Sequence, residues 1–183
     1  MIVEGDDSWM FQIPGTSLVQ RQAKLCDYDW LPITTRGVQE EEISDLENAL
    51  SQIDIDGIVS GAIRSDYQKT RLERMCERLG IKSFTPLWHQ SSESHMDGLV
   101  NHGFQVMITG VSSEGLTDEW LGHILTPESL RRMKSLAAKY RFNVDGEGGE
   151  YETLVVAGPH MKGSLDLVYK IEWNGVRGHL IFE

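Results

Sequence analysis

Short apolar runs alternate with amphipathic helical patterns up to Val111, and this alternation restricts the fold of that part of the chain. Apolar runs of this length, with turn residues around them, predict strands, whereas the amphipathic segments between them predict helices. Such a rhythm is typical of a parallel sheet with helices on both faces, whose ligands bind beyond the carboxyl ends of the strands. We therefore expect a site that includes residues 60–68. The predicted strands are Ile2–Val3, 31–34, 56–63, 82–84 and 104–111.

The clearest helical pattern follows Ser65. Ser65 and Gln68 form an S-x-x-Q capping box, apolar residues then repeat at helical spacing, and Gly80 ends the helix. Helical spacing places a stripe of mostly basic residues on the opposite face, which is either a solvated basic surface or an edge that faces an anion. The residues of this stripe are Tyr67, Arg71, Arg74 and Arg78. An earlier helix opens with the acidic run 39–42, which we interpret as a solvated helix face.

Beyond Val111 the pattern changes to that of a smaller α+β unit. Helices are predicted at 117–125 and 128–140. Strand-like runs follow at 154–157, 165–173 and 176–182.

Charge, cysteines and histidines exclude several classes of function. Seventeen Lys and Arg against 28 Asp and Glu give a net charge of −11, which repels phosphate backbones, so we expect no direct nucleic-acid partner. No apolar run is long enough to cross a bilayer, and we expect no membrane association and a cytoplasmic location. The cysteines and histidines lack metal-ligand spacing, so no protein-bound metal site is predicted.

Residues 145–153 are the least ordinary segment, because they interleave carboxylates with glycines. Clustered carboxylates repel one another unless a cation, an amine or a proton offsets them, while glycines let a ligand approach the backbone closely. The segment is therefore either an exposed acidic turn or a site for a cationic group. It is not a dinucleotide fingerprint, since Tyr151 stands where the third glycine belongs.

Several segments occur in the same order as in a known family. They are residues 56–63 with Ser65, Tyr67, Gln68, Arg71, Glu73 and Cys76; Pro86-Leu87-Trp88; 103–111 with 120–122; and Gly-Glu-Gly-Gly-Glu-Tyr-Glu-Thr at 146–153. Together they resemble the diphthine-ammonia ligase family, ATP-binding relatives of the PP-loop ATP pyrophosphatases. The resemblance implies an α/β fold: an adenine-nucleotide α-hydrolase-like (HUP/Rossmann-like) parallel sheet over residues 1–100, N-terminally truncated, and a C-terminal α+β substrate-recognition domain over 101–183.

The resemblance also implies an activity, which is ATP-dependent amidation of diphthine on translation elongation factor 2. ATP with Mg²⁺ activates the diphthine carboxylate as an acyl-adenylate and releases pyrophosphate, and ammonia then displaces AMP. The implied catalytic residues, which face ammonia or the trimethylammonium group, are Glu147, Glu150 and Glu152. The implied nucleotide-binding residues are Ser60, Gly61, Ala62, Ser65, Gln68 and Arg71. The implied substrate-binding residues are Gly146, Gly148, Gly149, Tyr151 (an aromatic face for the cation) and Thr153.

One departure from the family pattern concerns the start of the chain. The S-G-G-K-D-S segment of the PP-loop is not in these 183 residues, and Met1-Ile2-Val3 resembles the second strand of the family. We expect a sheet that lacks a central strand, supplied by an upstream segment, by a partner chain or within a homo-oligomer. Two alternative functions follow: a non-catalytic module that binds elongation factor 2 or a partner chain, and another PP-loop-type amidating or thiolating enzyme.

Overall fold

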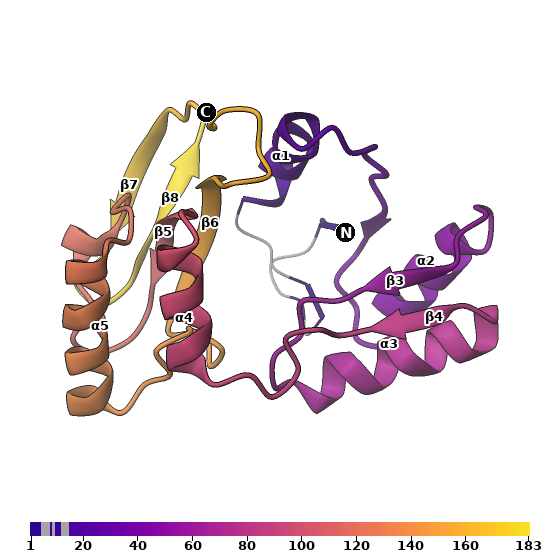
Figure 1. Ribbon diagram of the computed structural model, residues 1–183, viewed down its shortest axis with the longest axis horizontal. Helices are drawn as coiled ribbons and strands as arrows, with labels where there is room; N and C mark the ends of the chain where they lie inside the picture. The colour runs from indigo at the N-terminus through magenta and orange to yellow at the C-terminus, as the bar shows by residue number, and fades with distance from the viewer. Residues whose placement is uncertain (5–7, 9, 12–14) are drawn as a thin grey trace. The chain divides into compact units, whose positions relative to one another are not determined.

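The computed structural model describes residues 1–4, 8, 10–11 and 15–183, which form two compact units (Figure 1). Met1–Ser17 and Leu31–Gln90 make up the first unit, and Leu18–Trp30 and Ser91–Glu183 the second. The sequence-based division after residue 100 lies inside the helix α4 (Ser92–Asn101), whose contacts belong to the second unit.

The first unit contains two short pairs of parallel strands. Strand β1 (Ile2–Val3) pairs with β2 (Thr34–Thr35), and β3 (Gly57–Val59) pairs with β4 (Lys82–Phe84). Among the described residues, these two pairs are separate sheets and not one continuous sheet. The predicted parallel pairing is thus present, whereas a single doubly covered sheet is not.

Helix α3 (Asp66–Leu79) confirms the predicted N-cap and terminal glycine but not the second half of the capping box, because the Gln68 side chain bonds to the Met10 carbonyl instead. The Ser65 hydroxyl accepts a hydrogen bond from the Gln68 amide at 3.3 Å, and Gly80 ends the helix with a left-handed φ of 71°. The apolar face of α3 buries Leu72, Met75 and Cys76 against helix α2 (Glu41–Leu50).

The interpretation of the acidic run as a solvated face is wrong for one residue. Glu42 is fully buried, whereas Glu40 and Glu41 are exposed. Glu42 lies one helical turn before Leu46 and two before Leu50, so it occupies the inward face of α2. The acidic run alone does not reveal that Glu42 is buried, because the exposure of each acid depends on where the helix begins. Glu40, with a φ of 67°, lies just before the first residue of α2.

A four-stranded antiparallel sheet forms the centre of the second unit. Its order is β6 (Tyr151–Ala157), β5 (Gln105–Val111), β8 (Gly178–Phe182) and β7 (Tyr169–Trp173). The prediction that residues 104–111 continue the parallel series is therefore wrong. Six of the seven residues of β5 are buried, and an apolar run of this kind looks the same in a parallel strand and in the centre of an antiparallel sheet.

Helices α4 and α5 (Pro127–Tyr140) pack against each other on one face of this sheet (Figure 1). The predicted helix over 117–125 is wrong beyond one turn: a 3-10 turn, η2 (Asp118–Trp120), is followed by extended chain in which Ile124 bridges to Met107. A further 3-10 turn, η1 (Thr16–Leu18), leads into helix α1 (Val19–Leu25), from which Gln22 donates a hydrogen bond to the Val155 carbonyl at 2.8 Å. In the described part of the chain no helix is long and apolar enough to span a membrane.

Gly98 provides a test of helix propensity in α4. A Cβ atom at this position would meet only the His102 ring, at 4.0 Å, and the backbone of Gly98 is helical. Gly98→Ala should raise the free energy of unfolding by about 0.5–1 kcal/mol, because alanine loses less backbone entropy in a helix. Urea denaturation followed by circular dichroism measures this change, and a loss of stability would contradict the assigned helical packing.

Candidate functional site

A cavity of about 590 Å³ lies in the first unit at the carboxyl end of β3. Its volume falls in the range of small-molecule sites, and apolar side chains dominate its lining. The described lining residues are Met1, Met10, Phe11, Leu46, Leu50, Ile58, Val59, Ser60, Gly61, Ala62, Gln68 and Leu72.

The turn after β3 supplies the polar edge of the cavity. The Ser60 amide donates to the Phe84 carbonyl at 2.9 Å, which fixes the end of β3 against β4. The Ser60 hydroxyl accepts from the Ala62 amide at 3.2 Å and closes the turn around Gly61. A Cβ atom on Gly61 would meet no atom within 4 Å, so this position opens onto free space.

Four of the six residues predicted to bind nucleotide line this cavity together: Ser60, Gly61, Ala62 and Gln68. Ser65 is instead the N-cap of α3, and its hydroxyl satisfies the Gln68 amide. Arg71 is not among the lining residues.

Arg71 is paired with Glu40, the residue just before α2. Its Nε lies 3.0 Å from Glu40 Oε1, and its guanidinium group lies over the Tyr67 ring at 3.4 Å from the ring centre. The hydrogen bond from Arg71 holds the pKa of the Glu40 carboxyl below its usual value. Charge on Arg71 is therefore already compensated, and an incoming phosphate would have to compete with Glu40.

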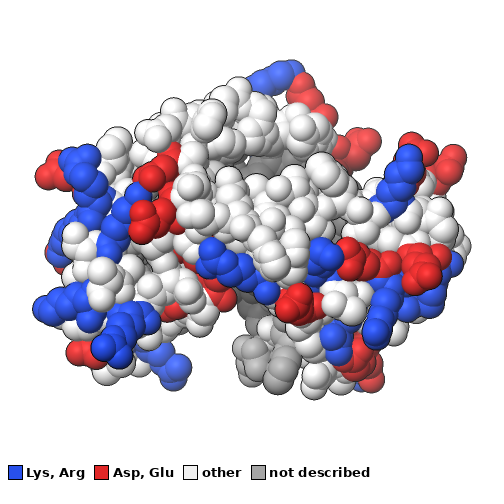
Figure 2. All heavy atoms as spheres, turned by 60° about the horizontal axis from the view of Figure 1, so that its bottom comes forward, with Lys and Arg blue, Asp and Glu red and all other residues white. Residues whose placement is uncertain are grey.

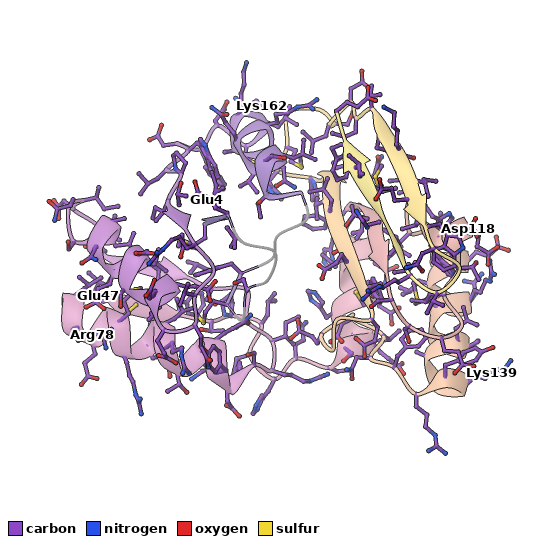
Figure 3. All side chains as sticks on the ribbon, turned by 180° about the vertical axis from the view of Figure 1, so that it is seen from behind. Glu4, Glu47, Arg78, Asp118, Lys139 and Lys162 are labelled. Atoms are coloured by element: carbon purple, nitrogen blue, oxygen red, sulfur yellow. The ribbon has the colours of Figure 1, made fainter. Side chains whose placement is uncertain are left out.

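The basic stripe of α3 continues this pattern at Arg78. Its Nε lies 2.8 Å from Glu47 Oε1, and Figure 3 shows the two side chains next to each other. On the face drawn in Figure 2, Lys and Arg likewise lie beside Asp and Glu. The stripe thus forms two ion pairs, one with the N-cap residue of α2 and one with α2 itself, and periodicity within α3 alone does not reveal them.

The wall of the cavity formed by Met10 and Phe11 was not predicted. The Gln68 side-chain amide donates to the Met10 carbonyl at 3.1 Å and so ties this wall to α3. Sequence separation hides the relation, since more than fifty residues lie between the two partners. In the sequence, the i, i+4 spacing of Leu46 and Leu50 indicates an apolar helix face, and both residues line the cavity.

In the second unit, Glu150 closes the acidic glycine-rich loop on itself. Its carboxylate accepts from the Asn143 amide at 2.8 Å, the Asn143 side-chain amide at 3.0 Å and the Gly148 amide at 2.8 Å. The Glu150 carbonyl accepts from the Ser112 amide at 2.9 Å. A carboxylate with three local N–H donors is well placed to hold the loop together.

Tyr151 is part of the core of the second unit. The side chain is 3% exposed, and its hydroxyl donates to the Val144 carbonyl at 2.5 Å. Burial raises the pKa of the Tyr151 hydroxyl well above its usual value. The structure thus places the ring of Tyr151 in the protein interior, where it anchors the loop.

Glu152 follows Tyr151 along β6, so its side chain is on the other face of the sheet. It packs over Gly110 of β5, and burial raises the pKa of its carboxyl. The cause of the raised pKa is desolvation by the surrounding protein, which disfavours the charged form of the carboxyl.

The other residues predicted as site residues in this segment either allow the turns of its backbone, pair within the sheet or lie at the surface. Gly146 and Gly149 have left-handed φ values of 75° and 77°, Gly148 is exposed, and Thr153 pairs with Ile108. Glu147 is exposed. Within the described ranges, no group of three or more His, Cys, Asp or Glu is arranged to hold a metal ion, so no chain residues are assigned to Mg²⁺.

Glu150→Ala tests the loop-closing role. Removing the acceptor leaves three N–H groups without their partner, and we expect a loss of about 1–2 kcal/mol in the free energy of unfolding. Glu147→Ala, which changes an exposed acid of the same loop, is the matched control and should lower stability less than Glu150→Ala does. Equal effects of the two substitutions in urea denaturation would refute the assignment.

Comparison with known proteins covers both units. Residues 1–83 match the diphthamide synthase N-terminal domain, and residues 91–183 match the diphthamide synthase C-terminal domain. Three similar proteins are named diphthine–ammonia ligase: one from Schizosaccharomyces pombe (31% identity; 90% of this chain, 30% of that protein), one from Homo sapiens (31%; 85% and 64%) and one from Rattus norvegicus (32%; 87% and 66%). The chain thus spans about two-thirds of the mammalian proteins and under a third of the yeast one. Because the matched domains lie in family order over nearly all of the sequence, the chain belongs to the diphthamide synthase family.

Proposed function

We propose that this chain takes part in the ATP-dependent amidation of diphthine on translation elongation factor 2, with the cavity of the first unit as the adenine-nucleotide site. The observation that carries the proposal is the cavity at the carboxyl end of β3, which lies in the part of the chain that matches the diphthamide synthase N-terminal domain. Similar proteins named diphthine–ammonia ligase support diphthine and ammonia as substrates.

The lining of the cavity suits a flat, mostly apolar base with a few polar edges. Ile58 and Leu72 offer apolar surface, Phe11 offers an aromatic face, and Ser60 and Gln68 offer a hydroxyl and an amide. Such a combination binds a ligand by burial and orients it by a small number of polar groups. The phosphates would extend along the open side at Gly61, where the backbone carries no side chain.

In the proposed reaction, a carboxylate oxygen of diphthine attacks the α-phosphorus of ATP, and pyrophosphate leaves. The ammonia nitrogen then attacks the acyl carbon, the bond to AMP breaks, and the nitrogen loses its extra proton. On the second unit, Glu152 in its carboxylate form is the proposed acceptor of that proton, and exposed Glu147 is proposed to face the cationic substrate. Mg²⁺ would be bound through the ATP phosphates, as is usual for this ion.

A second candidate function is a module that binds elongation factor 2 or a partner chain without turning over ATP. It is favoured by the pairing of Arg71 with Glu40, which leaves that predicted phosphate ligand already compensated. The alternative of an amidating or thiolating reaction on another substrate uses the same proposed ATP site.

Calorimetric titration of the 183-residue chain with Mg-ATP tests the proposal. We expect saturable binding of ATP and weaker binding of Mg-CTP, because the smaller pyrimidine fills less of the cavity. Absence of ATP binding together with binding to diphthine-bearing elongation factor 2 would replace the ligase proposal by the module.

A further inference from the structure

Glu42 is a buried acid that the proposed reaction does not use. Its side chain is 0% exposed, and its Oε2 has no hydrogen-bond partner among the residues that the structure describes. A buried carboxylate with an unsatisfied oxygen is costly, so its presence requires a compensating role. The helix dipole does not explain the burial, because Glu41 occupies the same first turn of α2 while remaining exposed.

The other oxygen of Glu42 accepts the hydroxyl hydrogen of Ser8. The same hydroxyl oxygen accepts from the Met10 amide at 3.2 Å and from the Phe11 amide at 2.9 Å. A serine hydroxyl has one hydrogen and two lone pairs. When the hydrogen is directed to Glu42, the lone pairs are directed away from it, toward the two amides.

These contacts lead from a buried acid to the cavity. Met10 and Phe11 line it, and so does Leu46, one turn after Glu42 on the same face of α2. Gln68 holds the Met10 carbonyl from the side of α3, so the wall has two anchors on two helices. We propose that Glu42 is a positioning residue, which fixes the Met10–Phe11 wall of the cavity by orienting the Ser8 hydroxyl.

The proposal rests on the proposed function only in assigning nucleotide to this cavity. The orientation of the wall itself can be measured without any ligand, by the rate at which the Met10 and Phe11 amide hydrogens exchange with solvent.

Hydrogen exchange of the full chain, with Glu42→Leu as the principal variant, tests the inference. Leucine replaces a buried polar carboxyl group by apolar carbon, so a packing role alone predicts equal or slower exchange in the core of the first unit. The positioning role predicts the opposite at one place: exchange of the Met10 and Phe11 amides should rise at least about tenfold, while the amides of α3 remain protected. Ser8→Ala should give the same local increase, and the double variant no more than either single one.

Two further variants distinguish the effect of the hydrogen bond to Ser8 from the effect of a negative charge in this helical turn. Glu42→Gln keeps an oxygen that accepts from Ser8 and should restore near-native exchange at Met10 and Phe11. Glu41→Gln removes a charge from the same helical turn without contacting Ser8 and should leave the exchange unchanged. Unchanged exchange in both Glu42→Leu and Ser8→Ala would overturn the inference, as would an equal increase in Glu41→Gln.

The affinity for Mg-ATP gives a separate result. If the wall contacts the nucleotide, Glu42→Leu should weaken binding about tenfold and Glu42→Gln much less. If the wild-type chain binds no ATP, the proposed function fails, whereas the local exchange result still decides the role of Glu42.

Discussion

Replacement of Gly61 by leucine is expected to weaken the binding of Mg-ATP at least about 100-fold, which corresponds to about 2.7 kcal/mol. Gly61 lines the cavity, and a Cβ atom there would meet no atom within 4 Å. Its φ lies outside the left-handed region, so a larger residue can adopt the same backbone. The side chain would therefore occupy free space where the ligand is proposed to lie, with little effect on the fold.

The matched control is Gly98→Leu, which makes the same chemical change in α4 of the second unit. Calorimetry with Mg-ATP should show native affinity for this control, and circular dichroism should show native helix content for both variants. A graded series at position 61, from alanine to leucine, should weaken binding progressively as the side chain grows. Native affinity in Gly61→Leu would place the nucleotide outside this cavity.

Local signals predicted the elements that position the cavity. The N-cap Ser65 and the terminal Gly80 were visible in the sequence because they bond to backbone groups close to them, whereas the Gln68 side chain bonds to the distant Met10 carbonyl and not back to Ser65. The position of Ser60, Gly61 and Ala62 beside the cavity followed from a general property of parallel strands, whose ligands lie beyond their carboxyl ends.

Non-local pairing explains what the sequence did not reveal. An apolar run such as β5 satisfies a parallel and an antiparallel sheet equally well, and only its partners β6 and β8 decide between them. Residues 122–125 have helical periodicity but bond to the edge of β5. Tertiary contacts overrode the local preference in both cases.

The same limitation applied to the acidic residues of the candidate site. A run of acids looks alike whether its members face solvent, a helix partner or the interior. In the structure Glu40 faces Arg71, Glu150 accepts backbone amides and Glu42 holds Ser8. These partners lie on other turns or elements, so composition indicated a charged segment but not its roles.

Gly178→Ala is expected to lower the free energy of unfolding by about 2–3 kcal/mol. Gly178 pairs with Trp173 of β7 and with Val111 of β5. A Cβ atom at this position would lie 2.3 Å from the Glu172 carbonyl oxygen and 2.8 Å from the Trp173 ring. The closer obstacle is backbone, which no change of rotamer can remove, so the two strands must separate.

Separation at Gly178 would weaken the sheet on both sides, since β8 is hydrogen-bonded to β5 and to β7. Urea denaturation followed by tryptophan fluorescence measures the loss, and Gly98→Ala serves as the control with the same added methyl group and the opposite expected sign. The two substitutions are chemically identical, so a difference in sign would come from the surroundings alone. If Gly178→Ala were as stable as wild type, the close approach of β7 and β8 at this position would have to be wrong.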